Sequence, residues 1–184
     1  VLARLEALHR DRSATLVTYW VWNMGGDLVG SAYVGQLSAT MKNYWSLGGS
    51  VSGSPARIDD RDTRGGPAMK RVPAWSSSLF LSSDARKKIR FDASGSYERN
   101  TVGGWALRAN PSLVYRPSSA FSVSAGPALA RSYGVAQYVT GVADPTAAAT
   151  YGRRTVYSEI DRTEVSLVSR LNVIFTPKMS FEIY

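Results

Sequence analysis

The chain contains no cysteine and a single histidine, His9, among its 184 residues. The first absence excludes disulfides, thiolate metal sites and cysteine nucleophiles. The second excludes a three-histidine zinc site, and a Ser–His–Asp triad would depend on His9, which lies in a segment (1–13) expected to be a leader, linker or loop. We therefore expect a non-enzymatic protein without cofactors or metal ions.

Long hydrophobic runs are also missing. The best candidate, residues 16–22, is short and interrupted by Thr18, whereas a membrane helix needs about 18 apolar residues. A helical membrane protein is therefore excluded. A membrane-spanning barrel of strands is not, because alternating residues average out in a hydropathy window, and the mean hydropathy is −0.16.

What the sequence does contain is alternation with a period of two. In residues 88–98, polar or charged residues alternate with apolar or small ones, so a strand there has one polar and one apolar face. The pattern lasts about ten residues and recurs along the chain, which is typical of transmembrane β-strands. We expect strands over residues 16–22, 28–41, 44–53, 72–82, 87–98, 105–116, 121–140, 153–175 and 179–184.

This pattern predicts an all-β fold: an antiparallel transmembrane β-barrel, present as a partial barrel of about nine strands, in one domain over residues 1–184. Connections alternate between short turns and longer loops, of which residues 54–71 form the longest, as in outer-membrane barrels. Pro111 and Pro127 fall inside strands and are expected to mark bulges. No signal peptide is visible and the last strand stops early, so we expect a fragment of a larger protein.

The net charge is +8, and five tryptophans and ten tyrosines are available for aromatic girdles at two membrane interfaces. Basic residues could bind nucleic acid, attract anions into a lumen, or lie at the rims against lipid phosphates. Nucleic acid is disfavoured because the charges are spread along the chain and lie on the strand face opposite to the aromatic residues.

Arginines occur in the polar phase of several expected strands. They would line one lumen, either as an anion-attracting interior or paired with Asp92, Glu98 and Glu164. The second interpretation is favoured because polar lumens are usually cross-braced. These arginines are Arg90, Arg108, Arg116 and Arg170.

Asp59, Asp60 and Asp62 lack the turn glycine and distal glutamate of a calcium loop and are interleaved with arginines, so we expect ion pairs there instead of a metal.

A different class of protein fits the same alternation: a soluble β-sandwich or small barrel that binds an anionic ligand through Arg90, Arg108 and Arg170. The apolar residues distinguish the membrane barrel from the soluble protein, because they face outward in a membrane barrel and inward in a sandwich. The discriminating residues are Trp75, Leu79, Leu81, Ile89, Phe91, Trp105, Leu107, Leu113, Phe121, Val123, Leu167, Leu171 and Val173.

The segment DRDTRGGPAMKRVP at residues 60–73 resembles the TRGGP loop of a group of bacterial outer-membrane barrels of unknown function. Further matches follow in order: KNYW, SDARK, RPS, QYV, RLN, FTP and FEIY, at 42–45, 83–87, 116–118, 137–139, 170–172, 175–177 and 181–184. Full-length members carry an N-terminal domain similar to family 9 carbohydrate-binding modules, followed by the barrel.

The resemblance implies the barrel fold, the bacterial outer membrane with its lipid bilayer as partner, and carbohydrate contact through an upstream domain. It transfers no catalytic residue. Arg64, Gly65, Gly66 and Pro67 match the loop motif. We expect this loop to fold inward against the lumen wall, with Arg64 paired to a lumen acid.

Overall fold

The computed structural model describes residues 9–64 and 66–184 and shows an all-β chain dominated by one antiparallel sheet. Nine strands follow one another in sequence order across it: β1 (His9–Trp22), β2 (Leu28–Met41), β3 (Ser46–Ser54), β6 (Ala74–Ser82), β7 (Ile89–Asn100), β8 (Trp105–Ser118), β9 (Phe121–Ala143), β10 (Arg153–Thr176) and β11 (Met179–Ile183). A two-stranded hairpin, β4 (Arg57–Asp59) and β5 (Met69–Arg71), lies between β3 and β6, and a 3-10 turn, η1 (Ala148–Thr150), lies between β9 and β10.

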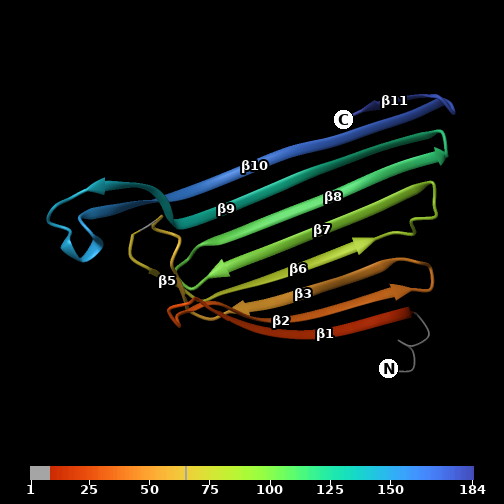
Figure 1. Ribbon diagram of the computed structural model, residues 1–184. Coiled ribbons are helices and arrows are strands. Elements are labelled where there is room, and N and C mark those ends of the chain that lie inside the picture. Colours follow the sequence, from red (N-terminus) through yellow and green to blue (C-terminus); the bar gives the residue numbers. More distant parts are fainter. Residues whose placement is uncertain (1–8, 65) are drawn as a thin grey trace.

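The sheet is curved but open (Figure 1). In the described part of the chain, β1 pairs only with β2 and β11 only with β10, so the sheet is not closed into a barrel. The prediction of an all-β antiparallel sheet is confirmed. The structure describes no helix long and apolar enough to cross a membrane.

One continuous register sorts the side chains into two faces. A single row across the sheet joins Leu37, Gly49, Leu79, Gly95, Ala109, Leu129 and Val165, all apolar or small. The adjacent row, on the other face, joins Gln36, Ser50, Ser78, Ser96, Arg108, Ala130 and Glu164. In the central part of the sheet, the alternation in the sequence therefore becomes one apolar and one polar face. Exceptions lie farther out: Arg99 and Arg131 are on the apolar face, and Val17 and Tyr19 of β1 are on the polar one.

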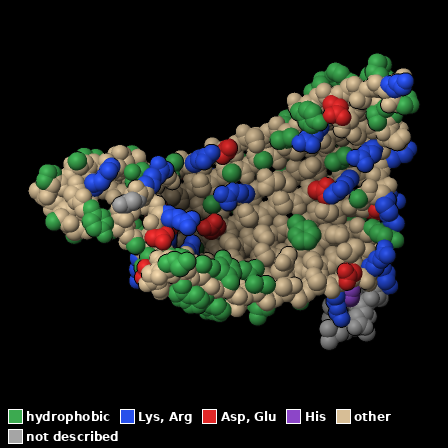
Figure 2. Space-filling model, in the orientation of Figure 1, with side chains coloured by type: hydrophobic (Ala, Val, Ile, Leu, Met, Phe, Trp, Pro, Cys, Tyr) green, Lys and Arg blue, Asp and Glu red, His purple; other side chains and the backbone are tan. Residues whose placement is uncertain are grey.

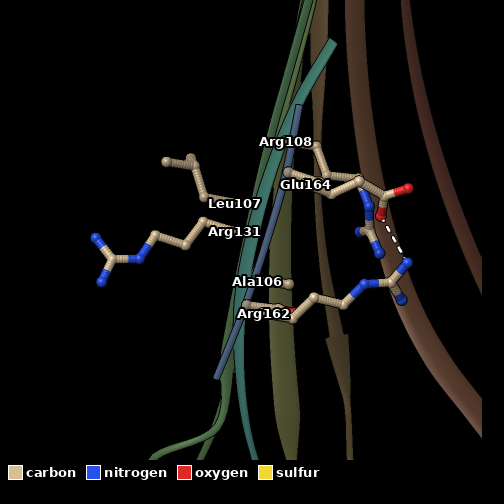
Figure 3. Close-up of a pocket in the computed structure, with 8 residues that line it drawn as sticks. Ala106, Leu107, Arg108, Arg131, Arg162 and Glu164 are labelled. Atoms are coloured by element: carbon tan, nitrogen blue, oxygen red, sulfur yellow. Dashed lines mark hydrogen bonds and ion pairs between the residues drawn. The ribbon is translucent and has the colours of Figure 1, made fainter. Parts of the chain in front are cut away.

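The polar face is the concave one. Viewed along the sheet, Arg108, Arg162 and Glu164 extend toward the side on which β1–β3 curve round, whereas Leu107 and Arg131 extend the opposite way (Figure 3). Figure 2 looks into this hollow, which is mostly tan with scattered charged side chains. The apolar face is accordingly convex.

The convex face is uncovered. Leu79, Val165 and Leu37 expose 72%, 73% and 66% of their area, and Ala32 is the only buried hydrophobic residue that the structure describes. By the register, the thirteen apolar residues expected to discriminate barrel from sandwich all lie on this face. Apart from the β4–β5 hairpin, the described residues form no second sheet to pack on it.

Residues 9–13 depart from the expectation of a leader or loop over 1–13. They form the start of β1, because β2 is long enough to pair with them: His9 lies opposite Met41 and Ser13 opposite Ser38. Residues 1–8 lie outside the described residues. The expected long loop at 54–71 likewise contains the short hairpin β4–β5.

The two prolines within strands do not create bulges where they lie. Pairing of β8 with β9 stops at Ala109–Leu129 and resumes at Leu113–Ala125 in the same register, which places Pro111 opposite Pro127. Because the two residues that lack an N–H donor face each other, hydrogen bonds between β8 and β9 are lost only around this one pair of residues. The register of β9 and β10 shifts elsewhere, next to Tyr157 and Ser158.

The longest connections lie at one end of the sheet. The turns β2–β3, β6–β7, β8–β9 and β10–β11 lie at the opposite end, here the short-turn end, while the 54–73 segment and the long tips of β9 and β10 lie at the loop end (Figure 1). The expected longer loop at 99–104 is instead a turn of four residues between β7 and β8, shorter than the six residues between β6 and β7.

Gly48 on β3 allows neighbouring strands to pack closely against it. A Cβ on Gly48 would lie 2.6 Å from the Leu37 carbonyl oxygen and 2.6 Å from the Phe80 ring, whereas a Cβ on Gly35 would meet nothing within 4 Å. We expect Gly48→Ala to lower the free energy of unfolding by about 1–3 kcal/mol through overpacking. The matched Gly35→Ala should be neutral or slightly stabilising. Denaturant titration followed by tryptophan fluorescence measures both, and equal effects would contradict the packing described.

Candidate functional site

The concave face is rich in hydroxyl groups that bind one another across strands. The hydroxyls of Ser50 and Ser78, and of Ser52 and Ser76, lie 2.8 Å apart. Near the β1 edge, Ser13 and Ser38 do the same at 2.7 Å. Short side chains joined in this way leave few bulky groups above β3 and β6, where the Phe80 ring lies against Gly48. On β1, Val17, Tyr19 and Val21 also lie on this face.

Two arginines on this face are neutralised within their own strand. Arg90 contacts both carboxylate oxygens of Asp92, at 2.7 and 2.8 Å, and the Arg162 guanidinium donates to Glu164 at 2.7 Å. In each case the partners are two residues apart, so the strand itself brings them to one face. The predicted pairing of Asp92 with an arginine is therefore observed.

Arg108 differs, because it forms no ion pair with any residue that the structure describes. Glu164, an expected partner, is occupied by Arg162, and Glu98 makes no ion pair in the described chain. Arg108 lies in a shallow pocket lined on the concave side by Ala106, Ala130, Ser132, Arg162 and Glu164 (Figure 3). It is thus a free guanidinium surrounded by small side chains and one ion pair.

The three predicted arginines do not converge. Arg90 lies on β7 and Arg108 on β8, while the Arg170 guanidinium, on β10, lies 5.0 Å from the centre of the Tyr184 ring. Because Arg90 and Arg170 have partners of their own, only Arg108 remains available for a ligand.

The second part of the site is the 54–71 loop, which an acidic and basic network holds together. Asp59 accepts hydrogen bonds from the backbone N–H groups of Arg61 and Asp62, both at 2.9 Å, and from Arg71 Nε at 2.8 Å. Arg71 also reaches Asp62 at 3.2 Å. The Arg61 N–H and the Arg71 guanidinium lower the pKa of Asp59, so this carboxylate stays ionised.

The loop bridges both sides of the open sheet at the loop end. Asn23, in the β1–β2 turn, donates to Asp60 at 3.4 Å. On the other side, the Tyr157 hydroxyl of β10 donates to Asp62 at 3.5 Å, and the Arg64 guanidinium lies 4.8 Å from the centre of the Tyr138 ring of β9. Since β1–β2 and β9–β10 are near opposite edges of the sheet, the loop spans the mouth of the hollow.

The described residues of the TRGGP motif lie close together within this loop. Thr63, 7% exposed, donates from its hydroxyl to the Pro67 carbonyl at 2.9 Å. A Cβ on Gly66 would lie 3.1 Å from Thr63, so glycine permits this close approach. Arg64 has a left-handed backbone, with φ of 52°. Gly65 lies outside the described residues.

The expected ion pair of Arg64 is not observed. Arg64 does not pair with an acid among the described residues. It stacks on an aromatic ring instead, because the nearby carboxylates are already bound by Arg71 and by backbone N–H groups. No group of three or more potential metal ligands gathers in the part of the chain that the structure describes.

Sequence reasoning missed Arg162, Tyr138 and Tyr157. The Arg–Thr–Glu spacing at 162–164, which puts the two charges on one face of a strand, would have identified the Arg162–Glu164 pair. Nothing local marks the two tyrosines as contacts of a loop far away in the sequence.

Because Arg71 binds both Asp59 and Asp62, we expect it to protect the 54–71 loop from proteases. Arg71→Gln removes one partner each from Asp59 and Asp62, which at this partly exposed site costs about 1 kcal/mol. We expect trypsin to cleave the loop about fivefold faster. Arg57→Gln is the matched control, because it removes a cleavage site from the same hairpin and Arg57 has no ion pair among the described residues. Equal cleavage rates would show that the network does not hold the loop.

Comparisons of the chain with protein-family models, with curated proteins and with solved structures found no match.

Proposed function

We propose that this chain forms part of a transmembrane β-barrel in a bacterial outer membrane, with its convex face against lipid and its concave face along an aqueous interior. In this proposal it is non-enzymatic and belongs to the C-terminal part of a larger surface protein involved in the binding or passage of a hydrophilic ligand. Contact with carbohydrate through an N-terminal domain is part of the same proposal and rests on the resemblance described above.

The observation that carries the proposal is the uncovered apolar face. In the central row, Leu37, Leu79, Leu129 and Val165 expose 43–73% of their area, with glycine or alanine between them, and exposed apolar side chains recur on this face in strand after strand. Such a surface goes far beyond the scattered apolar residues of an ordinary soluble protein. A bilayer would remove this area from water without a second protein layer. In the soluble alternative, a second sheet would have to cover the same residues.

Aromatic residues at both ends of this face support a membrane-sized band. One row at the loop end contains Tyr33, Trp75, Trp105 and Tyr133, while Tyr115 and Phe121 lie near the short-turn end. Along β8, Trp105 and Tyr115 are ten residues apart. At about 3.3 Å per residue and a tilt of about 40°, this gives roughly 25 Å, the height of the apolar band of outer-membrane barrels.

The concave face supports a hydrophilic interior with an excess of positive charge. Paired serine hydroxyls present polar groups without net charge, and among the three predicted arginines only Arg108 has neither an acid nor an aromatic ring against its guanidinium in the described chain. Binding or passage of a solute that carries an anionic group fits this arrangement. The proposal of an arginine-lined anion site is thereby reduced from three residues to Arg108.

Adjacent single cysteines test the orientation of the two faces, because the natural chain has none. In membranes, Ser78→Cys should react with a water-soluble thiol reagent, while Leu79→Cys should be protected from it and accessible to a lipid-soluble quencher. Ala85→Cys, in an exposed turn, is the positive control. Reaction of Leu79→Cys with the water-soluble reagent at the rate of Ala85→Cys would refute the membrane proposal.

Conductance across a planar bilayer tests the interior. Arg108→Ala should shift the reversal potential toward lower anion preference, since an uncompensated positive charge is lost. Arg131→Ala, which removes the same charge from the opposite face of the neighbouring strand, should leave it unchanged. The absence of any conductance would refute passage, and equal shifts in the two variants would refute a special role for Arg108.

A further inference from the structure

Unpaired cations gather at the short-turn end of the sheet. They are Lys42 after β2, Lys87 and Lys88 before β7, Arg116 near the end of β8, and Lys178 between β10 and β11; together we call them the basic rim. All five are exposed, and none makes an ion pair with a described residue. In Figure 2, blue side chains lie along the corresponding right-hand edge.

Basic residues at the loop end are balanced by acids. Its connections (23–27, 55–73, 101–104 and 144–152) contain five basic and five acidic residues, and Arg71 contacts Asp59 and Asp62 there. The connections at the short-turn end (42–45, 83–88, 119–120 and 177–178) contain five basic residues and only one acid, Asp84, so the excess positive charge lies at this end.

The β6–β7 turn shows how rim cations are held outward. Asp84, only 4% exposed, binds the Arg86 guanidinium through both oxygens at 2.8 Å, and that guanidinium lies 3.2 Å from the centre of the Tyr44 ring. Arg86 lowers the pKa of Asp84 to about 2, so the pair persists at physiological pH. This fixed turn leaves Lys87 and Lys88, the next residues, exposed.

Rim cations directly adjoin the apolar face. Lys42 follows Met41, Lys88 precedes Ile89, and Lys178 precedes Met179, and each of these neighbours falls in the apolar phase of its strand. Arg116 similarly follows Tyr115, and its N–H donates to the Lys88 carbonyl at 2.6 Å. Each charge thus lies just beyond the last apolar row, where a long basic side chain reaches the headgroup layer of a bilayer.

We propose that the basic rim binds the phosphate groups of anionic phospholipids in the leaflet next to the short turns. The inference rests on the proposed function, since it requires the convex face to be in a bilayer. Each basic residue near an anionic membrane surface contributes about a fivefold preference for anionic lipid, and salt weakens it. Because basic-rim residues recur from turn to turn, phosphate groups can bind along the whole short-turn edge of the sheet.

The test uses the full-length protein in vesicles of phosphatidylcholine with trace spin-labelled phosphatidylglycerol or phosphatidylcholine. The measured quantity is the ratio of the two lipids immobilised at the protein surface. We expect the natural protein to prefer phosphatidylglycerol, and the triple variant Lys87→Gln, Lys88→Gln and Lys178→Gln to lose at least tenfold of that preference. The triple variant Arg57→Gln, Lys70→Gln and Arg153→Gln, with the same charge loss at the loop end, is the control and should retain it.

The outcomes separate the two proposals. If neither labelled lipid is immobilised, the membrane proposal fails and the rim proposal fails with it. If both are immobilised equally, or if the control variant loses as much preference as the rim variant, the membrane proposal stands and the rim proposal is overturned. The rim proposal is also overturned if soluble poly-glutamate binds the rim while phosphatidylglycerol is not preferred, because the partner would then be an acidic polypeptide.

Discussion

The structure depends on one constraint, the cross-strand register that keeps alternate positions on opposite faces through the central part of the nine-stranded sheet. Register shifts occur only near strand ends and in the outer part of β9 and β10. Because side chains alternate every residue, a slip of one position in any pair would move a strand's leucines into the hydroxyl-rich hollow and its serines onto the convex face. The row from Leu37 to Val165 shows that this does not happen. Even Pro111 and Pro127, opposite each other, interrupt the hydrogen bonds of β8 and β9 without changing the register.

The strands could be predicted from the sequence because their signal is local. The segment 28–41 was expected from its own residues and is β2 with those bounds, and the long 153–175 segment is β10 with one more residue. The start of β1 could not be found in this way, since residues 9–13 show little alternation and extend only because β2 offers them partners. Whether residues 9–13 form a strand therefore depends on their pairing with β2 as well as on their own sequence.

The site was predicted less completely, for a related physical reason. Residue type and strand phase placed Arg90 and Arg108 on the polar face, and the Arg90–Asp92 pair follows from a spacing of two. Whether a given arginine is neutralised depends on neighbours across strands and on loops. Thus Arg64 meets Tyr138 instead of an acid, and Glu164 is bound by Arg162, which leaves Arg108 without an acidic partner among the described residues.

β9 and β10 are much longer than the other strands, so the hairpin they form projects beyond the other connections at the loop end. From Tyr133, in the row of aromatic residues, β9 continues for ten residues to Ala143, and β10 returns beside it. At about 3.3 Å per residue this hairpin extends roughly 33 Å beyond the aromatic row. Because the short turns lie at the opposite end, the tip around η1 is the part of the described chain that projects farthest from the sheet, and a large molecule that approaches the loop end would contact it first (Figure 1).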